Sequence, residues 1–208
     1  MKRILLSMIA VITFGFVNAQ DVKYGVKGGL NVSNFSGDTD GMDLKARFGF
    51  NVGGFVEVKL SEKISLQPEL LYSTQGAKFA NVGGDVDGVF YTGDVKMNLG
   101  YINVPVMFKY YGTQKFYVEV GPQIGFLVSA KSKTKLDGFN RTNELDIKDY
   151  FKSIDFGVNF GAGYDFTENL SVAARYNLGL ANIGKTVAGD DGKLRNGVFS
   201  LSVGYKFK

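Results

Sequence analysis

Long stretches of this chain alternate, residue by residue, between apolar side chains and small or polar ones. From Arg47 to Leu60, one side carries only apolar residues and glycine, while the other carries Arg47, Gly49, Asn51, Gly53, Phe55, Glu57 and Lys59. Successive side chains of a β-strand point to opposite faces, so this period of two predicts one strand with an uncharged face. The stretch is far longer than the usual globular strand of about 5–6 residues. Such strands are typical of β-barrels that cross a lipid bilayer.

Repetition of this pattern predicts an all-β protein with eight strands. Helical periodicity is absent from the segments, which are 22–34, 47–60, 64–76, 96–110, 115–131, 152–166, 170–182 and 196–208. Short turns should alternate with long polar connections at 35–46, 77–95, 132–151 and 183–195. Short periplasmic turns and long external loops are the rule in outer-membrane barrels. We therefore expect an eight-stranded antiparallel up-and-down transmembrane β-barrel.

The first residues have the three parts of a secretory signal. Lys2 and Arg3 precede an apolar stretch, 4–16, that is too short to span a bilayer comfortably, and Ala19 closes a segment of small residues. We expect residues 1–19 to be a cleaved signal peptide and residues 20–208 to be a single outer-membrane β-barrel domain. An uncleaved membrane anchor is the alternative.

The apolar face and the polar face of each predicted strand suit different surroundings. An eight-stranded barrel has an interior only just wide enough for side chains, so the many bulky apolar residues should face outward, into lipid. A soluble β-sandwich that buries them between two sheets is the alternative. Aromatic residues near the expected turns predict a girdle at the periplasmic interface, made of Tyr24, Tyr110, Tyr111, Phe116, Tyr164, Phe166, Tyr205 and Phe207.

Charged residues on the inward face need partners, because an unpaired buried charge is very costly. Counting from the turns places the following set at neighbouring depths: Glu57, Glu69, Lys109, Glu119 and Arg175. Arginine offers five donors and stays charged, so Arg175 can bridge several carboxylates. We expect a structural interior polar network centred on Arg175, and a gate or ion path is the alternative.

The composition argues against catalysis. The chain has no histidine and no cysteine, which removes the usual general base at neutral pH and any thiol chemistry. Nucleotide, phosphate-loop and zinc patterns are absent. We expect no catalytic residues, no cofactor and no metal. The acidic loop 38–43 is interpreted as solvated, with a Ca²⁺ site as the less favoured reading.

The net charge and the position of the basic residues also limit the classes of partner that can be expected. Without residues 1–19 the chain carries two more basic than acidic residues, too mild a balance to indicate nucleic acid. Lys131, Lys133 and Lys135 form a basic edge beside the third expected long loop. The partners expected are outer-membrane lipid and an unidentified extracellular ligand or protein, and the basic edge leaves contact with lipopolysaccharide open against a simple solvated charge run.

The segment 101–110 resembles the PorT-like outer-membrane β-barrel family of Bacteroidota. That family often has an aromatic, an aliphatic, Glu, an aliphatic and then Pro here, and this chain has Tyr101, Ile102, Asn103, Val104 and Pro105. Asn replaces the Glu, which removes one interior charge. Further matches are Gly121-Pro122 and Gly161-Ala162-Gly163-Tyr164. The resemblance covers nearly all of the mature chain and implies a barrel architecture more firmly than an activity.

Together these features predict a non-enzymatic outer-membrane β-barrel protein with a structural or interaction role. Long extracellular loops on a rigid scaffold would bind the ligand or partner. The alternatives are a narrow or gated transport or secretion-accessory barrel and a soluble secreted β-sandwich binding module.

Overall fold

The computed structural model describes residues 22–38, 43–86, 89–136, 142–185 and 192–207. Residues 1–19, expected to form the signal peptide, lie outside this range. The strands are β1 (Val22–Gly37), β2 (Leu44–Lys59), β3 (Ile64–Val86), β4 (Val89–Tyr111), β5 (Phe116–Leu136), β6 (Thr142–Asp146), β7 (Ile154–Asp165), β8 (Leu170–Gly179) and β9 (Leu194–Lys206). One 3₁₀ turn, η2 (Lys148–Tyr150), lies between β6 and β7.

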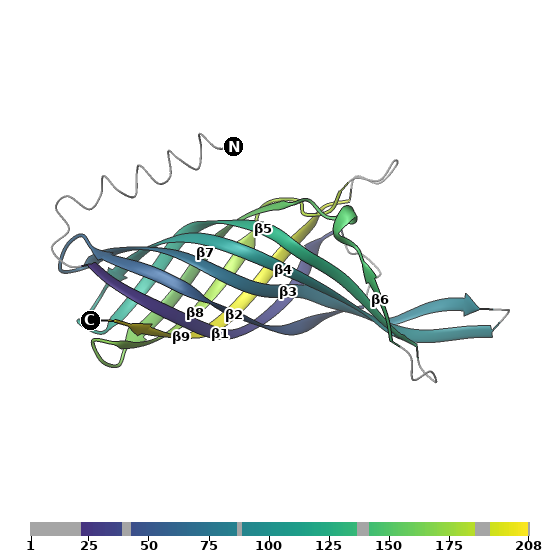
Figure 1. The fold of residues 1–208 in the computed structure, drawn as a ribbon, viewed down its shortest axis with the longest axis horizontal. Coiled ribbons are helices and arrows are strands. Elements are labelled where there is room, and N and C mark those ends of the chain that lie inside the picture. The colour runs from purple at the N-terminus through teal and green to yellow at the C-terminus, as the bar shows by residue number, and fades with distance from the viewer. Residues whose placement is uncertain (1–21, 39–42, 87–88, 137–141, 186–191, 208) are drawn as a thin grey trace.

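The strands close into a ring, which confirms the predicted fold. Their order is β4-β3-β2-β1-β9-β8-β7-β5, and β4 pairs with β5 to complete the circle. Every described pairing is antiparallel, and β6 adds to β5 outside the ring. Figure 1 shows the tilted strands wrapping around one axis. The eight-stranded up-and-down barrel follows, and a two-sheet sandwich is excluded.

Apolar side chains cover the outside of the ring. Leu30 on β1 is 67% exposed, and Phe108 on β4 and Phe199 on β9 are about half exposed. Their neighbours on the same strands, such as Asn31, are buried inside the barrel. Because an uncovered apolar surface of this extent would associate in water, the belt fits a lipid environment.

Three tight turns share one local hydrogen-bonding pattern at the same end of the barrel. Each contains a hydroxyl residue, Ser61, Thr113 or Thr167, whose side-chain oxygen accepts hydrogen bonds from the backbone N–H groups two and three residues later. Serine and threonine commonly stabilise turns in this way. We call this end the turn end and the opposite end the loop end.

Interior glycines make room for aromatic rings. A Cβ atom on Gly25 would lie 2.2 Å from the ring of Phe55, and one on Gly163 would lie 2.3 Å from the ring of Tyr117. Both rings are buried inside the barrel. The high glycine content therefore lets a narrow barrel hold large interior side chains.

Strand lengths differ from the prediction on one side of the barrel. β3 and β4 have 23 residues each and β5 has 21, against 12 for β7 and 10 for β8. Most of the segments 77–95 and 132–151, expected as loops, instead extend the sheet past the barrel (Figure 1). We call this extension the wing and define it as 77–86, 89–98, 129–136 and 142–146. Gly76 at its base has φ of +133°, which favours glycine.

The expected aromatic girdle is only partly an outer feature. Tyr24, Tyr110 and Tyr164 are exposed near the turn end. Two neighbouring pairs stack edge to face, Tyr164 with Phe166 and Tyr205 with Phe207. Tyr111 differs because its hydroxyl lies inside the barrel, close to two carboxylates. The expectation was wrong for this residue, because its odd-numbered position on β4 is an inward one.

Candidate functional site

Arg175 holds two carboxylates in the middle of the barrel. Its Nη1 and Nη2 atoms donate to the two oxygens of Glu69, each at 2.9 Å, and its Nε donates to Glu119 Oε1 at 2.8 Å. Lys27 Nζ lies 3.3 Å from both Glu69 oxygens, and Gln67 Nε2 donates to the same carboxylate at 2.6 Å. We call Lys27, Glu69, Glu119 and Arg175 the central cluster. All four are buried.

The register of the strands explains how the central cluster forms. Gly161 on β7 lies between Glu119 on β5 and Arg175 on β8, as the cross-strand partner of both. A Cβ atom on Gly161 would lie 2.9 Å from Glu119 Oε1. The missing side chain therefore leaves the space through which the arginine and the glutamate meet.

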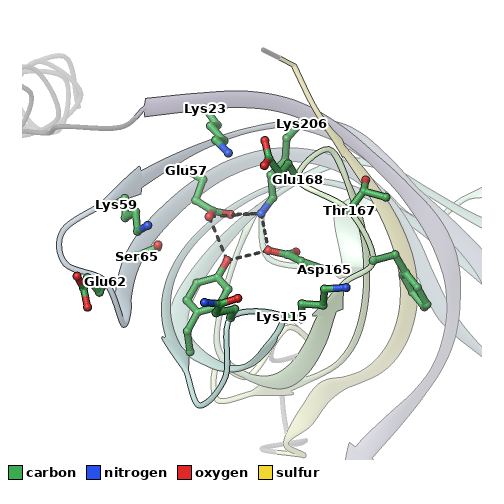
Figure 2. A pocket seen from close by; sticks show the side chains of 13 residues that line it. Lys23, Glu57, Lys59, Glu62, Ser65, Lys115, Asp165, Thr167, Glu168 and Lys206 are labelled. Carbon is green, nitrogen blue, oxygen red and sulfur yellow. Dashed lines mark hydrogen bonds and ion pairs between the residues drawn. The ribbon is translucent and has the colours of Figure 1, made fainter.

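A second group of charges lies at the turn end of the interior. Lys109 Nζ is 3.0 Å from Glu57 Oε2, and Lys206 Nζ lies 3.2 Å from the same oxygen and 2.9 Å from Asp165 Oδ2. The Tyr111 hydroxyl is 3.1 Å from Glu57 and 3.3 Å from Asp165, so its single proton can serve either carboxylate. Figure 2 shows Lys206 between Glu57 and Asp165. We call Glu57, Lys109, Asp165 and Lys206 the mouth cluster.

The five residues expected to form one network are thus divided between two clusters. Glu69, Glu119 and Arg175 meet, whereas Glu57 and Lys109 belong to the mouth cluster. Glu57 lies two residues nearer the turn than Phe55, the cross-strand partner of Glu69, so Lys109 and Lys206 reach it instead of Arg175. Among the described residues, Arg175 therefore contacts Glu69 and Glu119 but not Glu57.

Sequence reasoning missed three members of these clusters and the tyrosine that bonds to the mouth cluster. Lys27 on β1 was left out, although it alternates with Val26, which faces outward. Lys206 on β9, Asp165 on β7 and Tyr111 on β4 were also left out, and all three lie at strand ends. Extending the alternation to the ends of the strands would have identified them.

Charge is balanced within each cluster. The central cluster pairs two cations with two carboxylates, and the mouth cluster does the same. Buried charges are stable only when paired and hydrogen-bonded. Because neither cluster has a net charge, the arrangement suits a structural core better than an ion-binding site.

Two further layers fill the barrel towards the loop end. The first is a layer of amides and hydroxyls, in which Asn31 donates to Ser73, Asn51 donates to Asn31, and Asn177 donates to Asn159. The cavity left there measures about 30 Å³, room for little more than a water molecule. The second layer is an apolar plug made of Phe35, Ala77, Leu99, Tyr101, Leu127, Ala130, Phe151 and Ile183.

The turn end is open by contrast. A cavity of about 690 Å³ lies there, and Glu57, Asp165 and Lys206 of the mouth cluster form part of its wall (Figure 2). Its rim carries Lys23, Lys59 and Lys115 beside Glu62 and Glu168. Two small cavities border the clusters in the described residues, one of about 10 Å³ and one of about 30 Å³, so the wide opening ends at the clusters.

The loop end holds the remaining residues considered from sequence. Asp38 accepts a hydrogen bond from the backbone of Lys193, and residues 39–42 of the acidic loop lie outside the described range. Lys131 and Lys133 both contact Glu144 on β6, at 2.6 and 2.8 Å. Hydrogen bonds from Lys131 and then Lys133 lower the pKa of the Glu144 carboxyl to about 2. Within the described residues, no group of three or more metal-ligating side chains is found.

Comparison with known proteins places the chain in a family. The profile described as "outer membrane protein beta-barrel domain" matches residues 18–184, most of the sequence. The chain belongs to this outer-membrane β-barrel family. The outer-membrane location predicted from the sequence is thereby confirmed. No curated protein matches the sequence.

One solved structure supports the same architecture for this outer-membrane barrel, and a second is reported beside it. Neisserial surface protein A is 17% identical, and the match covers 90% of this chain and 100% of that one with a TM-score of 0.52. The Yersinia pestis attachment invasion locus protein Ail, solved with the heparin analogue sucrose octasulfate, is 15% identical with the same coverage and a TM-score of 0.47. At such low identity the likeness to Neisserial surface protein A supports the fold alone.

Proposed function

We propose that this outer-membrane barrel is a non-enzymatic interaction protein whose wing and loops bind a ligand or protein partner outside the cell. The observation that carries the proposal is the contrast between a filled interior and a long external extension of the sheet. Binding residues commonly lie on segments that a rigid scaffold holds in place. By the general orientation of such barrels, the loop end faces the exterior.

The filled interior supports the absence of enzymatic function. The charged side chains inside are engaged with one another, and the chain contains no histidine. A catalytic acid or base needs access to substrate. The central cluster lies between layers that leave only small cavities.

The wing supports a role in recognition. It presents Leu145 at 63% and Val82 at 42% exposure beyond the barrel, and the nearby Tyr150 is 65% exposed. Exposed apolar side chains rimmed by charges are common where proteins meet partners. The same sheet remains continuous with the barrel, so the surface is held rigidly.

Two narrower assignments belong to the same proposal. The resemblance at 101–110 supports membership of the PorT-like group of Bacteroidota barrels, and residues 1–19 act as a signal peptide cleaved before Gln20. N-terminal sequencing of the protein extracted from outer membranes should begin at Gln20. Retention of Met1 would overturn the cleavage.

Photo-crosslinking in intact cells tests the recognition role. A photoreactive residue at Leu145 or Tyr150 should give a specific adduct with an external molecule, whereas the same residue at Glu62 in a turn serves as the matched control. Adducts formed only from Glu62 would place the interaction in the periplasm and contradict the proposal.

A gated transport or secretion-accessory role is the second candidate. The cavity of about 690 Å³ at the turn end favours it, because it gives the periplasm access to the mouth cluster. Transport would then require the central cluster and the apolar plug to move. Gated steps of current through the protein in a planar lipid bilayer would support this candidate, and a silent bilayer would favour a protein that only displays a surface.

A further inference from the structure

Four lysines form a straight row across the wing. Lys45 on β2 is the cross-strand partner of Lys78 on β3, Lys78 is that of Lys96 on β4, and Lys96 is that of Lys133 on β5. Directly opposed residues of a sheet share one face, so all four side chains leave the wing on the same side. Neighbouring strands lie about 4.8 Å apart, so the row is about 14 Å long.

This face continues the lipid-facing surface of the barrel. On β4, every second residue from Lys96 shares one face of the strand. This face includes Asn98, Gly100 and then Ile102, which belongs to the outward apolar surface. Six residues of strand rise about 20 Å, and a tilt near 45° brings the vertical distance to about 14 Å. This height places Lys96 towards the headgroups of the outer leaflet, and the ends of the row differ in height by about 10 Å because the strands are tilted.

The row brings four like charges together, and nearby carboxylates offset them only in part. Like charges placed directly opposite each other destabilise a sheet. Carboxylates relieve the repulsion at three positions, because Asp43 contacts Lys45, Asp94 contacts Lys78, and Glu144 contacts Lys133. Lys96 stands between two of these lysines, is exposed, and has no carboxylate oxygen within 4.0 Å among the described residues.

We propose that the lysine row binds the phosphate groups of an anionic glycolipid in the outer leaflet of the outer membrane. The row is long enough to contact more than one phosphate, and Lys96 is its central contact. Sequence alone drew attention to Lys131, Lys133 and Lys135, which lie along one strand. The structure assigns the site instead across four strands, where only Lys133 is shared. This site is on the lipid side of the wing, so it is independent of the external recognition role.

Native mass spectrometry of the full protein in zwitterionic detergent tests the site. The probes are a glycolipid with two phosphates and the same glycolipid with both phosphates removed. The test variant is K78Q/K96Q/K133Q, and the matched control is K59Q/K63Q/K115Q at the turn end, which removes the same charge. Each lysine near an anionic surface contributes roughly a fivefold change in affinity, so the test variant should bind about 100-fold more weakly.

The expected result is retention of the phosphorylated glycolipid by the wild type and the control but not by the test variant. Equal retention of the dephosphorylated glycolipid would show binding through acyl chains and overturn the proposal. Displacement by millimolar inorganic phosphate would identify free phosphate as the ligand and also overturn it.

Thermal unfolding provides a readout that does not depend on lipid. In lipid-free detergent the K96Q variant should melt no lower than the wild type, because the substitution removes repulsion. Adding the phosphorylated glycolipid should then raise the melting temperature of the wild type more than that of K96Q. A lower melting temperature of K96Q without lipid would mean that Lys96 is already paired, and the proposal would fail.

Discussion

In the barrel interior each clustered lysine and arginine lies against a carboxylate, whereas in the wing lysines lie opposite lysines on neighbouring strands. Both arrangements use the same alternation of side chains across the sheet. The difference follows from the surroundings, because unmatched charge cannot be buried but can be tolerated beside water and lipid headgroups. The comparison assigns structural stability to the interior and interaction to the wing.

Replacing Arg175 should have the largest effect on this comparison. R175A leaves Glu69 and Glu119 without their main partner, and breaking a buried pair costs about 3–5 kcal/mol. The free energy of unfolding in lipid vesicles should fall by that amount, and R175K should recover only part of it, because lysine lacks the planar fork.

K63A in an exposed turn is the control for this measurement, and it should unfold like the wild type. Unfolding of R175A at the wild-type urea concentration would show that the central cluster contributes nothing to stability. It would also place the register of β8 in doubt.

The mouth cluster should be less sensitive than the central one. K206A removes contacts to Glu57 and Asp165, but both carboxylates can then be hydrated from the open cavity beside them. We expect a loss of about 1–3 kcal/mol, in the range of hydrogen bonds to charged groups. A loss equal to that of R175A would remove the distinction between the clusters.

The smallest effect concerns an exposed contact in the wing. Hydrogen bonds from Lys131 and Lys133 lower the pKa of Glu144 to about 2. The ion pairs of Glu144 with these lysines therefore contribute fully above pH 4.5, the ordinary pKa of a glutamate, and are lost as the pH falls towards 2. NMR titration of the side-chain carboxyl carbon should show this shifted midpoint in the wild type. The midpoint should return towards the ordinary value in K131Q/K133Q, and an unchanged midpoint would contradict the contact.

The ring of strands could be predicted from sequence because one constraint acts along its whole length. Lipid outside and a narrow lumen inside enforce alternation from Val22 to the last strand. In the wing that contrast disappears, since Lys78 and Lys96 occupy outward positions that are apolar lower down. The extended strands were therefore taken for loops.

The interior site could be anticipated only in part, for a geometric reason. Alternation places Arg175, Glu69 and Glu119 on the inward face, where the structure has them. Counting residues from the turns failed for Glu57, because tilted strands shift the depth of each residue relative to its neighbours. The pairing of interior charges depends on how far neighbouring strands are shifted relative to one another, and this shift cannot be read from one sequence alone.

Recording current through the wild-type protein in a planar lipid bilayer tests the central claim, a sealed interior, most directly. The layers of amides and apolar side chains above the central cluster predict no large, steady conductance at neutral pH. A steady conductance of the size of a general porin would show an open lumen and contradict the account.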